Sequence, residues 1–198
     1  MKSKLLLLLA APLLLTGCKA GGSSEAPAPS SSESSGSGSE SSSSEPVLSP
    51  LETAQAAYGA SVSAAAGGAA ATWAATSNPA LFVLKVGGYQ GLTFGGPDTS
   101  AYPDDAEQSV LSPVISTLAG LLPSGFAIDG EAHFYDGIIT EDMTDEEKEE
   151  HDFWGDEDGS TALEAYYVNS DLVVFDFVAY CYQGYLIGDV YSFQGSAA

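Results

Sequence analysis

The 198-residue chain contains no arginine, and five lysines oppose 27 acidic residues. Of those acids, 23 lie in residues 46–198, where Lys85 and Lys148 are the only bases besides histidine. A folded domain that binds nucleic acid or an anionic bilayer needs a basic surface, so both functions are excluded for this segment. Phosphate and carboxylate ligands are disfavoured because the arginine fork is missing. Such a surface attracts cations and basic partners, and it also keeps a protein soluble.

Long apolar runs and common catalytic motifs are missing as well. A membrane-spanning helix needs about 20 apolar residues, whereas the run at residues 5–15 is about half as long and contains Pro12. The chain has no Gly-Xaa-Ser-Xaa-Gly elbow, phosphate-binding loop or dinucleotide fingerprint. The sequence therefore favours a removable signal over a spanning helix, and it excludes the commonest motif-bearing enzymes.

The N-terminus has the order of parts of a secretory signal. Lys2 and Lys4 precede the apolar run, and Leu15-Thr16-Gly17-Cys18 follows it. This order resembles the signal peptide and lipobox of bacterial lipoproteins. The resemblance implies that residues 1–17 are removed by cleavage between Gly17 and Cys18, and that Cys18 is acylated and anchors the chain on the outer face of a membrane. An ordinary secretory signal followed by a chance cysteine is the alternative.

A tether is predicted to follow the anchor. Residues 19–45 are almost entirely Ser, Gly, Glu, Pro and Ala, so they bury too little surface to offset the entropy of ordering and are expected to be disordered. A coil of this length reaches about 30 Å on average. Residues 18–45 thus connect the lipid to one globular domain, residues 46–198. A long Ser/Glu/Gly tether after a lipobox is similar to those of Gram-positive surface lipoproteins.

The second cysteine, Cys181, is interpreted as a buried and inert thiol. With Cys18 lipidated it has no disulfide partner in the mature chain. At strand spacing it shares a face with four apolar residues, Val173, Phe175, Phe177 and Ala179. A nucleophilic thiol would need a histidine or a base beside it, and none is near in sequence.

Two helices are expected in the first half of the domain. Ser49-Pro50-Leu51-Glu52 combines an N-cap, a proline at the first helical position and a glutamate three residues after the cap. Apolar residues at helical spacing form one stripe from Leu51 to Trp73, and Gly67-Gly68 weakens or breaks the helix within it. A second helix is predicted over residues 105–122, in which Pro113 produces a kink or restarts the helix after the cap Ser112.

Strands are predicted at Phe82–Val86 and Thr93-Phe94, and residues 126–139 are expected to form a hairpin around Asp129-Gly130. The clearest pattern is C-terminal, where three strand-like runs with short turns predict a meander: residues 163–168, 172–182 and 185–193. The predicted fold class is α+β, with N-terminal helices packed on a mainly antiparallel sheet that ends in this meander.

Residues 141–158 contain 11 acids and allow two interpretations. In the first, Thr144 caps a short helix with an acidic first turn, whose polar face is solvated. In the second, four residues wrap a calcium ion, with turns at Gly155 and Gly159: Asp152, Asp156, Asp158 and Ser160. The spacing does not fit an EF-hand. If Gly159 is taken as the glycine of the EF-hand loop, Trp154 occupies the first ligand position, and tryptophan cannot bind calcium there. No cofactor is expected apart from calcium at this site.

Two further constellations carry weaker signals. Glu147 and His151 lie four residues apart on the expected helix, and His133 could join them around zinc, but histidines without a short ligand motif are more often incidental. A glycosidase needs two facing carboxylates. Asp176 is eligible, as are Asp129 and Glu131 beside His133, although Asp176 is expected to be wetted by solvent.

Tyrosines crowd the last strands: Tyr166, Tyr167, Tyr180, Tyr182, Tyr185 and Tyr191. Tyr180 and Tyr182 fall on the face opposite Cys181, and we expect a helix layer to cover that face. If the face is open, tyrosines beside carboxylates would suit a glycan or peptide partner.

Three functions are compatible with this sequence. The favoured hypothesis is a non-enzymatic, membrane-anchored binding module for a wall polymer, glycan, peptide or basic protein partner. The alternatives are a carboxylate-based glycan hydrolase, which would need a cleft with two facing carboxylates, and a small solute-capturing lipoprotein of a transporter.

Overall fold

The computed structural model describes residues 47–97, 101–155 and 159–196. All of them belong to one compact unit, Glu45–Ala198. The predicted lipobox and tether lie outside the described residues. In the part of the chain that is described, no helix combines the length and the apolar character needed to cross a membrane.

The described residues form an antiparallel sheet of nine strands, whose main path runs β1-β2-β9-β8-β7-β5. Short strands β3, β4 and β6 pair with β2, β9 and β7. The strands are β1 (Ala71–Ala75), β2 (Phe82–Val86), β3 (Tyr89–Gln90), β4 (Leu92–Gly95), β5 (Ala127–Ile128), β6 (His133–Tyr135), β7 (Ala162–Val168), β8 (Val173–Tyr182) and β9 (Tyr185–Gln194).

The predicted C-terminal meander is confirmed, because β7, β8 and β9 are neighbours in both the sequence and the sheet. Gln183 and Gly184 join β8 to β9 with φ angles of 50° and 80°. Two consecutive left-handed residues make the tight turn whose twist matches that of a hairpin. The turn places Tyr182 opposite Tyr185 and so sets the register along both long strands.

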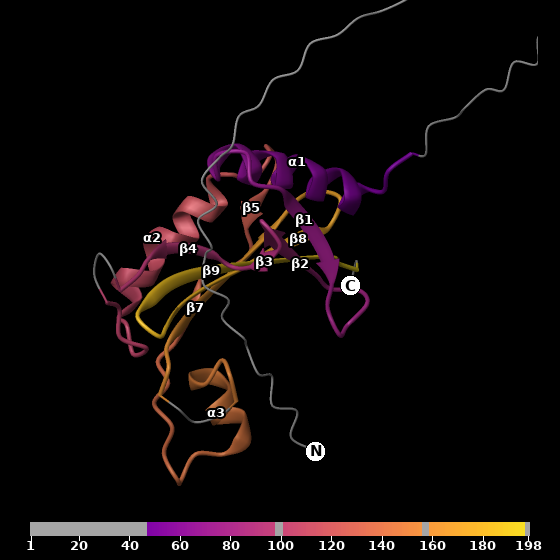
Figure 1. The fold of residues 1–198 in the computed structure, drawn as a ribbon. Helices are drawn as coiled ribbons and strands as arrows, with labels where there is room; N and C mark the ends of the chain where they lie inside the picture. The colour runs from indigo at the N-terminus through magenta and orange to yellow at the C-terminus, as the bar shows by residue number, and fades with distance from the viewer. Residues whose placement is uncertain (1–46, 98–100, 156–158, 197–198) are drawn as a thin grey trace, which may run out of the picture. The chain divides into compact units, whose positions relative to one another are not determined.

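The core lies between this sheet and two helices, α1 (Pro50–Ala65) and α2 (Gln108–Ala119), which pack on the same side of the sheet (Figure 1). The Tyr58 ring of α1 lies 4.9 Å from the Phe175 ring of β8. Its hydroxyl donates to the Leu118 carbonyl of α2 at 3.1 Å. Tyr58 therefore joins both helices to the sheet. The third helix, α3 (Asp145–His151), buries none of its residues.

The start of α1 follows the prediction, whereas its end does not follow the apolar stripe. Ser49 and Glu52 form a complete capping box. The helix ends at Ala65, since Gly67 and Gly68 adopt left-handed φ angles of 67° and 92° that a helix cannot accommodate. Placing Trp73 on the helix was therefore wrong. It lies in β1, and its indole N–H donates to the Gln55 carbonyl of α1 at 2.9 Å.

Two other local predictions are corrected. Helix α2 is continuous through Pro113 and begins after Glu107, so Ser112 does not cap a restarted helix. The hairpin around Asp129-Gly130 is also wrong. Strands β5 and β6 do not pair with each other; both pair with β7, one after the other along its edge. Pairing with a long strand of the core satisfies more of the backbone than an isolated short hairpin does.

The α+β class and the mainly antiparallel sheet are confirmed. The helices, however, are not an N-terminal block. Strands β1–β4 separate α1 from α2, and α3 lies between β6 and β7. The first half of the domain thus contributes both the helical layer and one edge of the sheet.

Candidate functional site

The long strands β7–β9 have two faces of different character. Val173, Phe175, Phe177, Ala179 and Cys181 are all buried beneath α1 and α2. Cys181 forms no disulfide, and burial followed by the charge of Asp104 raises the pKa of its thiol to about 11. Both facts support the interpretation as an inert core thiol.

The opposite face carries Tyr166, Tyr180 and Tyr191, and we name this side of β7–β9 the tyrosine face. The expectation that a helix layer covers it was wrong, since α1 and α2 pack on the Cys181 side. Helices pack on the sheet face that offers the larger continuous apolar surface. The residues of β8 on the Cys181 side include no charged residue. The tyrosine face is interrupted by acids and cannot offer such a stripe.

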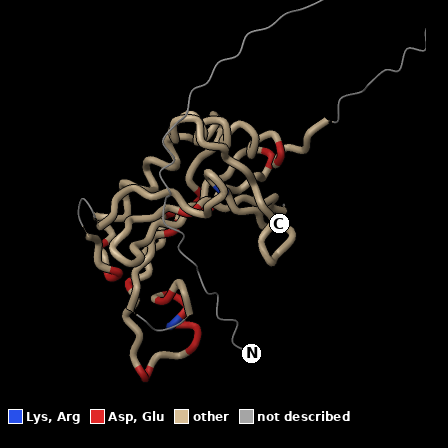
Figure 2. Tube along the Cα trace, viewed as in Figure 1, with Lys and Arg blue, Asp and Glu red and all other residues tan. Residues whose placement is uncertain are grey.

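Three acids lie on the tyrosine face, one on each long strand: Glu164 on β7, Asp176 on β8 and Asp189 on β9. The register places Val178 between Glu164 and Asp189 in one row of cross-strand partners. Asp176 is one row away, between Tyr166 and Tyr191. Asp176 is therefore the diagonal neighbour of both other acids. Figure 2 shows acidic positions within the sheet as well as around α3.

All three acids are removed from water. The exposed fractions are 9% for Glu164, 9% for Asp176 and 3% for Asp189. The expectation that solvent wets Asp176 was therefore wrong: its carboxyl group is almost entirely buried although α1 and α2 pack on the other face. Buried carboxyl groups are rare without a paired charge.

The hydrogen bonds of the acids are incomplete. Glu164 Oε2 accepts from the Tyr135 hydroxyl at 2.8 Å. Asp189 Oδ2 accepts from Gln90 Nε2 at 2.7 Å and from the Tyr191 hydroxyl at 3.3 Å. Asp176 Oδ1 and Asp189 Oδ1 are buried and have no hydrogen-bond partner among the described residues. Each such oxygen costs roughly 1–3 kcal/mol, so the arrangement opposes folding.

The protonation of Asp176 reflects this environment. Burial raises the pKa of Asp176 to about 8, and the charges of Glu164 and then Asp189 add to the effect. Burial also raises the pKa of Asp189, against the hydrogen bonds that favour its charged form. At neutral pH Asp176 is mostly a neutral acid beside other acids, as in sites that hold or transfer a proton.

The surrounding tyrosines remain protonated donors at any physiological pH. Burial raises the pKa of four hydroxyls well above the usual value: Tyr135, Tyr166, Tyr180 and Tyr191. Nearby acids raise these pKa values further, because a phenolate would be repelled by them. The tyrosines can therefore donate to the acids and cannot neutralise them.

Aromatic rings extend the tyrosine face toward the segment after α3. Ring centroids are separated by 5.1 Å for Tyr135 and Phe153, 4.8 Å for Phe153 and Trp154, and 5.0 Å for Trp154 and Tyr180. Trp154 is 41% exposed and Tyr166 is 37% exposed. The acids are thus bordered by aromatic side chains that a ligand can contact.

The capped-helix interpretation of the acidic segment is confirmed, because the first turn of α3 is acidic and none of its residues is buried. Thr144 and Glu147 form a capping box at the start of α3, as the capped-helix interpretation predicts. Asp152 Oδ1 accepts from the backbone N–H groups of Trp154 and Gly155, at 3.0 and 2.9 Å. Asp156 and Asp158 lie outside the described residues, so calcium binding stays a prediction.

The other sequence candidates do not come together. Glu147 bonds to Thr144, His151 Nδ1 lies 2.7 Å from Asp136 Oδ1, and His133 Nε2 lies 3.0 Å from the Glu150 carbonyl. In the described part of the chain, no group of three or more His, Cys, Asp and Glu residues is placed to hold a metal ion. Asp129 and Glu131 are exposed between β5 and β6, whereas the acids near Asp176 are Glu164 and Asp189.

Glu164 and Asp189 were missed by the sequence analysis, although a signal for them exists. Each is a single acid within an apolar strand-like run, on the same alternation as a tyrosine. The tight Gln183-Gly184 turn sets the pairing of β8 and β9, and this pairing alone brings Asp189 next to the row of Asp176. Strand alternation together with the length of this turn predicts that Asp189 lies beside Asp176.

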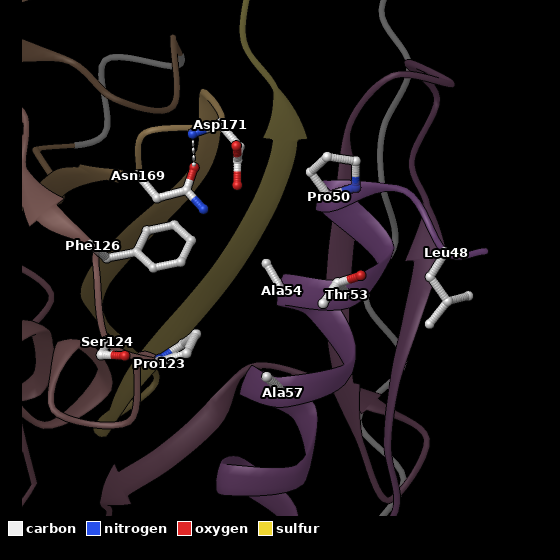
Figure 3. Close-up of a pocket in the computed structure, with 10 residues that line it drawn as sticks. All are labelled: Leu48, Pro50, Thr53, Ala54, Ala57, Pro123, Ser124, Phe126, Asn169 and Asp171. Carbon is white, nitrogen blue, oxygen red and sulfur yellow. Dashed lines mark hydrogen bonds between the residues drawn. The ribbon is translucent and has the colours of Figure 1, made fainter.

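A hollow of about 380 Å³ lies elsewhere, between the start of α1 and the β7–β8 turn (Figure 3). Its lining is largely small or apolar, and Asp171 is its only acid. The Asn169 side chain accepts from the N–H groups of Asp171 and Val173 and so serves the turn. The other polar side chains of its lining are those of Thr53 and Ser124.

Comparisons with protein-family models, with curated proteins and with solved structures each found no match to this chain.

Proposed function

We propose that this protein is a non-enzymatic binding module, anchored through acylated Cys18 to the outer face of the membrane, and that the tyrosine face is its binding surface. The two buried oxygens without partners, Asp176 Oδ1 and Asp189 Oδ1, carry this proposal. The lipobox resemblance supports the anchor, and the composition of residues 18–45 supports a tether. A cell wall of the Gram-positive type is the setting that this arrangement suits.

The energetic cost of the acids supports binding over a structural role. A sheet face without a helix needs no carboxylates, and apolar side chains of similar size would avoid the loss of hydration. Residues that lower the stability of the fold, and that form no compensating contacts, are expected at functional sites. A partner that supplies the missing hydrogen bonds would recover the cost, whether it is a wall polymer, glycan, peptide or protein.

A carboxylate-based glycan hydrolase is the second candidate, because a glycosidase acid needs a raised pKa and Asp176 has one. The buried oxygens do not separate the two functions, because a substrate and a binding partner must both displace covering side chains to reach them; the hydrolysis test below decides between them. A transporter receptor of the two-lobed kind receives no support from a single compact unit.

The binding surface can be tested with the full chain purified in detergent. We expect it to bind purified cell-wall material or members of a glycan and peptide array, and we expect Tyr166→Ser to weaken that binding at least tenfold. Tyr89→Ser is the matched control, because Tyr89 is 63% exposed and lies on β3, outside the tyrosine face. Equal loss in both variants, or in neither, would overturn the assignment of the surface.

The same preparation tests the absence of catalysis. We expect no release of reducing ends from wall glycans and no cleavage of wall peptides over a day of incubation. Hydrolysis that disappears in Asp176→Asn would contradict the proposal and establish the glycan hydrolase instead.

A further inference from the structure

We propose that the acids of the tyrosine face bind an ammonium group presented by the ligand, such as a lysine side chain or a free peptide amine. This inference rests on the proposed binding function and adds the chemical class of the ligand. It goes beyond a platform for sugars or apolar side chains, because it makes one charged donor the centre of recognition.

The hydrogen-bond pattern indicates what is missing. Tyr135, Tyr191 and Gln90 already donate to Glu164 and Asp189. The unpartnered atoms are Asp176 Oδ1 and Asp189 Oδ1, and both are acceptors once Asp176 has released its proton. A ligand must therefore bring N–H or O–H donors to adjacent strands, and an ammonium group carries three donors on one atom.

The charge pattern indicates that these donors are cationic. Lys85 lies on the same side of the sheet, because Val83, two residues before it on β2, pairs with Tyr191. It forms no ion pair with a described carboxylate. The chain has no arginine to offer. A metal ion is a poorer fit, since no described cluster has the geometry to hold one. A positive charge from outside would stabilise three acids at once.

The aromatic border suits the same ligand. Trp154 and Tyr180 are in edge contact, and Tyr166 is partly exposed beside the acids. Aromatic rings attract an ammonium group with about 0.5–2 kcal/mol each when it lies over a ring face. Because the two oxygens are buried, binding requires the side chains around them to move, as interface side chains commonly do.

Binding of this kind is coupled to pH. The cation favours ionised Asp176, so binding below pH 8 releases a proton from that acid. The titratable groups on the same side of the sheet as Asp176 are Glu164 and Tyr166 on the adjoining β7, Asp189 and Tyr191 on the adjoining β9, and, one strand further away, Tyr135 and His133 on β6 and Lys85 on β2. A lysine amine stays charged up to about pH 10, so affinity rises as the pH increases from 6 to 8.

The experiment is calorimetry on the full chain in detergent, with the capped peptide acetyl-Ala-Lys-Ala-amide and its Nε-acetyl-lysine counterpart as probes. We expect the first to bind at least tenfold more tightly than the second, with proton release below pH 8. The double variant Asp176→Asn with Asp189→Asn should lose this preference. Glu146→Gln with Glu149→Gln on α3 removes the same charge outside the tyrosine face and should retain it. Near-UV circular dichroism verifies the fold of each variant.

Each outcome is decisive. Equal affinity for both probes, or equal loss in both double variants, overturns the ammonium site, because recognition is then independent of the amine or of these acids. If neither probe binds but cell-wall binding still depends on Tyr166, the ammonium site fails and the proposed function stands. If that dependence is also absent, both proposals fail together.

Discussion

Asp176 is the residue at which the folding of this domain and its proposed function oppose each other. The carboxyl group is 9% exposed and lies diagonally between Glu164 and Asp189. Burial is the largest cause of its raised pKa, and the neighbouring acids come second. A group of this kind lowers stability at neutral and alkaline pH, so its presence needs a benefit elsewhere.

The sign of the pH effect follows from the shift. In the unfolded chain Asp176 loses its proton near pH 4, whereas in the folded domain it keeps it until about pH 8. Its contribution to stability is thus fully present below pH 4 and is lost as the pH rises to 8, at no more than about 1.4 kcal/mol per unit. Asp176→Asn cannot ionise, so we expect a flatter profile and a stability relative to the unsubstituted chain that rises from pH 5 to pH 8, by no more than about 1.4 kcal/mol per unit.

Urea unfolding of the full chain at pH 5, 6, 7 and 8 measures this profile. Glu146→Gln on the exposed α3 is the control, and it should leave the profile of the unsubstituted chain unchanged. A profile for Asp176→Asn as steep as that of the unsubstituted chain would show that Asp176 does not hold the proton.

At the scale of elements, the same capping motif occurs on two helices with different roles. Ser49 begins α1, which buries Tyr58 and Val62 against the sheet, whereas Thr144 begins α3, which buries no residue. A cap contributes to global stability only as far as its helix unfolds with the core. Helix α3 is therefore an element that can open without the rest of the domain.

This contrast gives a paired prediction. Ser49→Ala should lower the global free energy of unfolding by about 1 kcal/mol. Thr144→Ala should leave that free energy nearly unchanged and should speed hydrogen exchange at the α3 amides. Denaturant unfolding and exchange mass spectrometry measure the two effects. An equal global loss in both variants would mean that α3 unfolds together with the core.

At the scale of the whole molecule, the proposed arrangement separates the anchor from recognition. The anchor is assigned to Cys18 and the ligand to a domain whose 23 acids outnumber two lysines. An acidic domain is repelled by anionic lipid, so a tether that extends away from the membrane suits its charge. Attraction of cationic partners to the domain then depends on salt.

The anchor has a matched control in the other cysteine. In a bacterial host that processes lipoproteins, we expect the mature chain to begin at Cys18 and to carry acyl groups, as measured by intact-mass spectrometry. Cys18→Ala should abolish acylation and remove the protein from the washed membrane fraction, whereas Cys181→Ala should remain there. Membrane retention of Cys18→Ala equal to that of the unsubstituted chain would contradict lipid anchoring.

The sequence by itself determined the local structure where neighbouring residues decide the outcome. Ser49 and Glu52 formed the predicted capping box, and the alternating runs formed the predicted meander, because hydrogen bonds across three residues and strand alternation need no distant contact. The extended helix stripe and the hairpin at Asp129-Gly130 failed, since Trp73 and β5–β6 gained more from pairing with distant strands.

Only the tertiary structure decided the candidate site. Asp176 was recognised as eligible, but its burial, and the presence of Glu164 and Asp189 beside it, depend on the register of three strands and on which sheet face the helices cover. Burial is a property of contacts between segments far apart in the chain, and the pKa of a carboxyl group follows burial. The pattern of residue types was therefore enough to select Asp176 as a candidate, whereas the packing of the sheet determined its protonation.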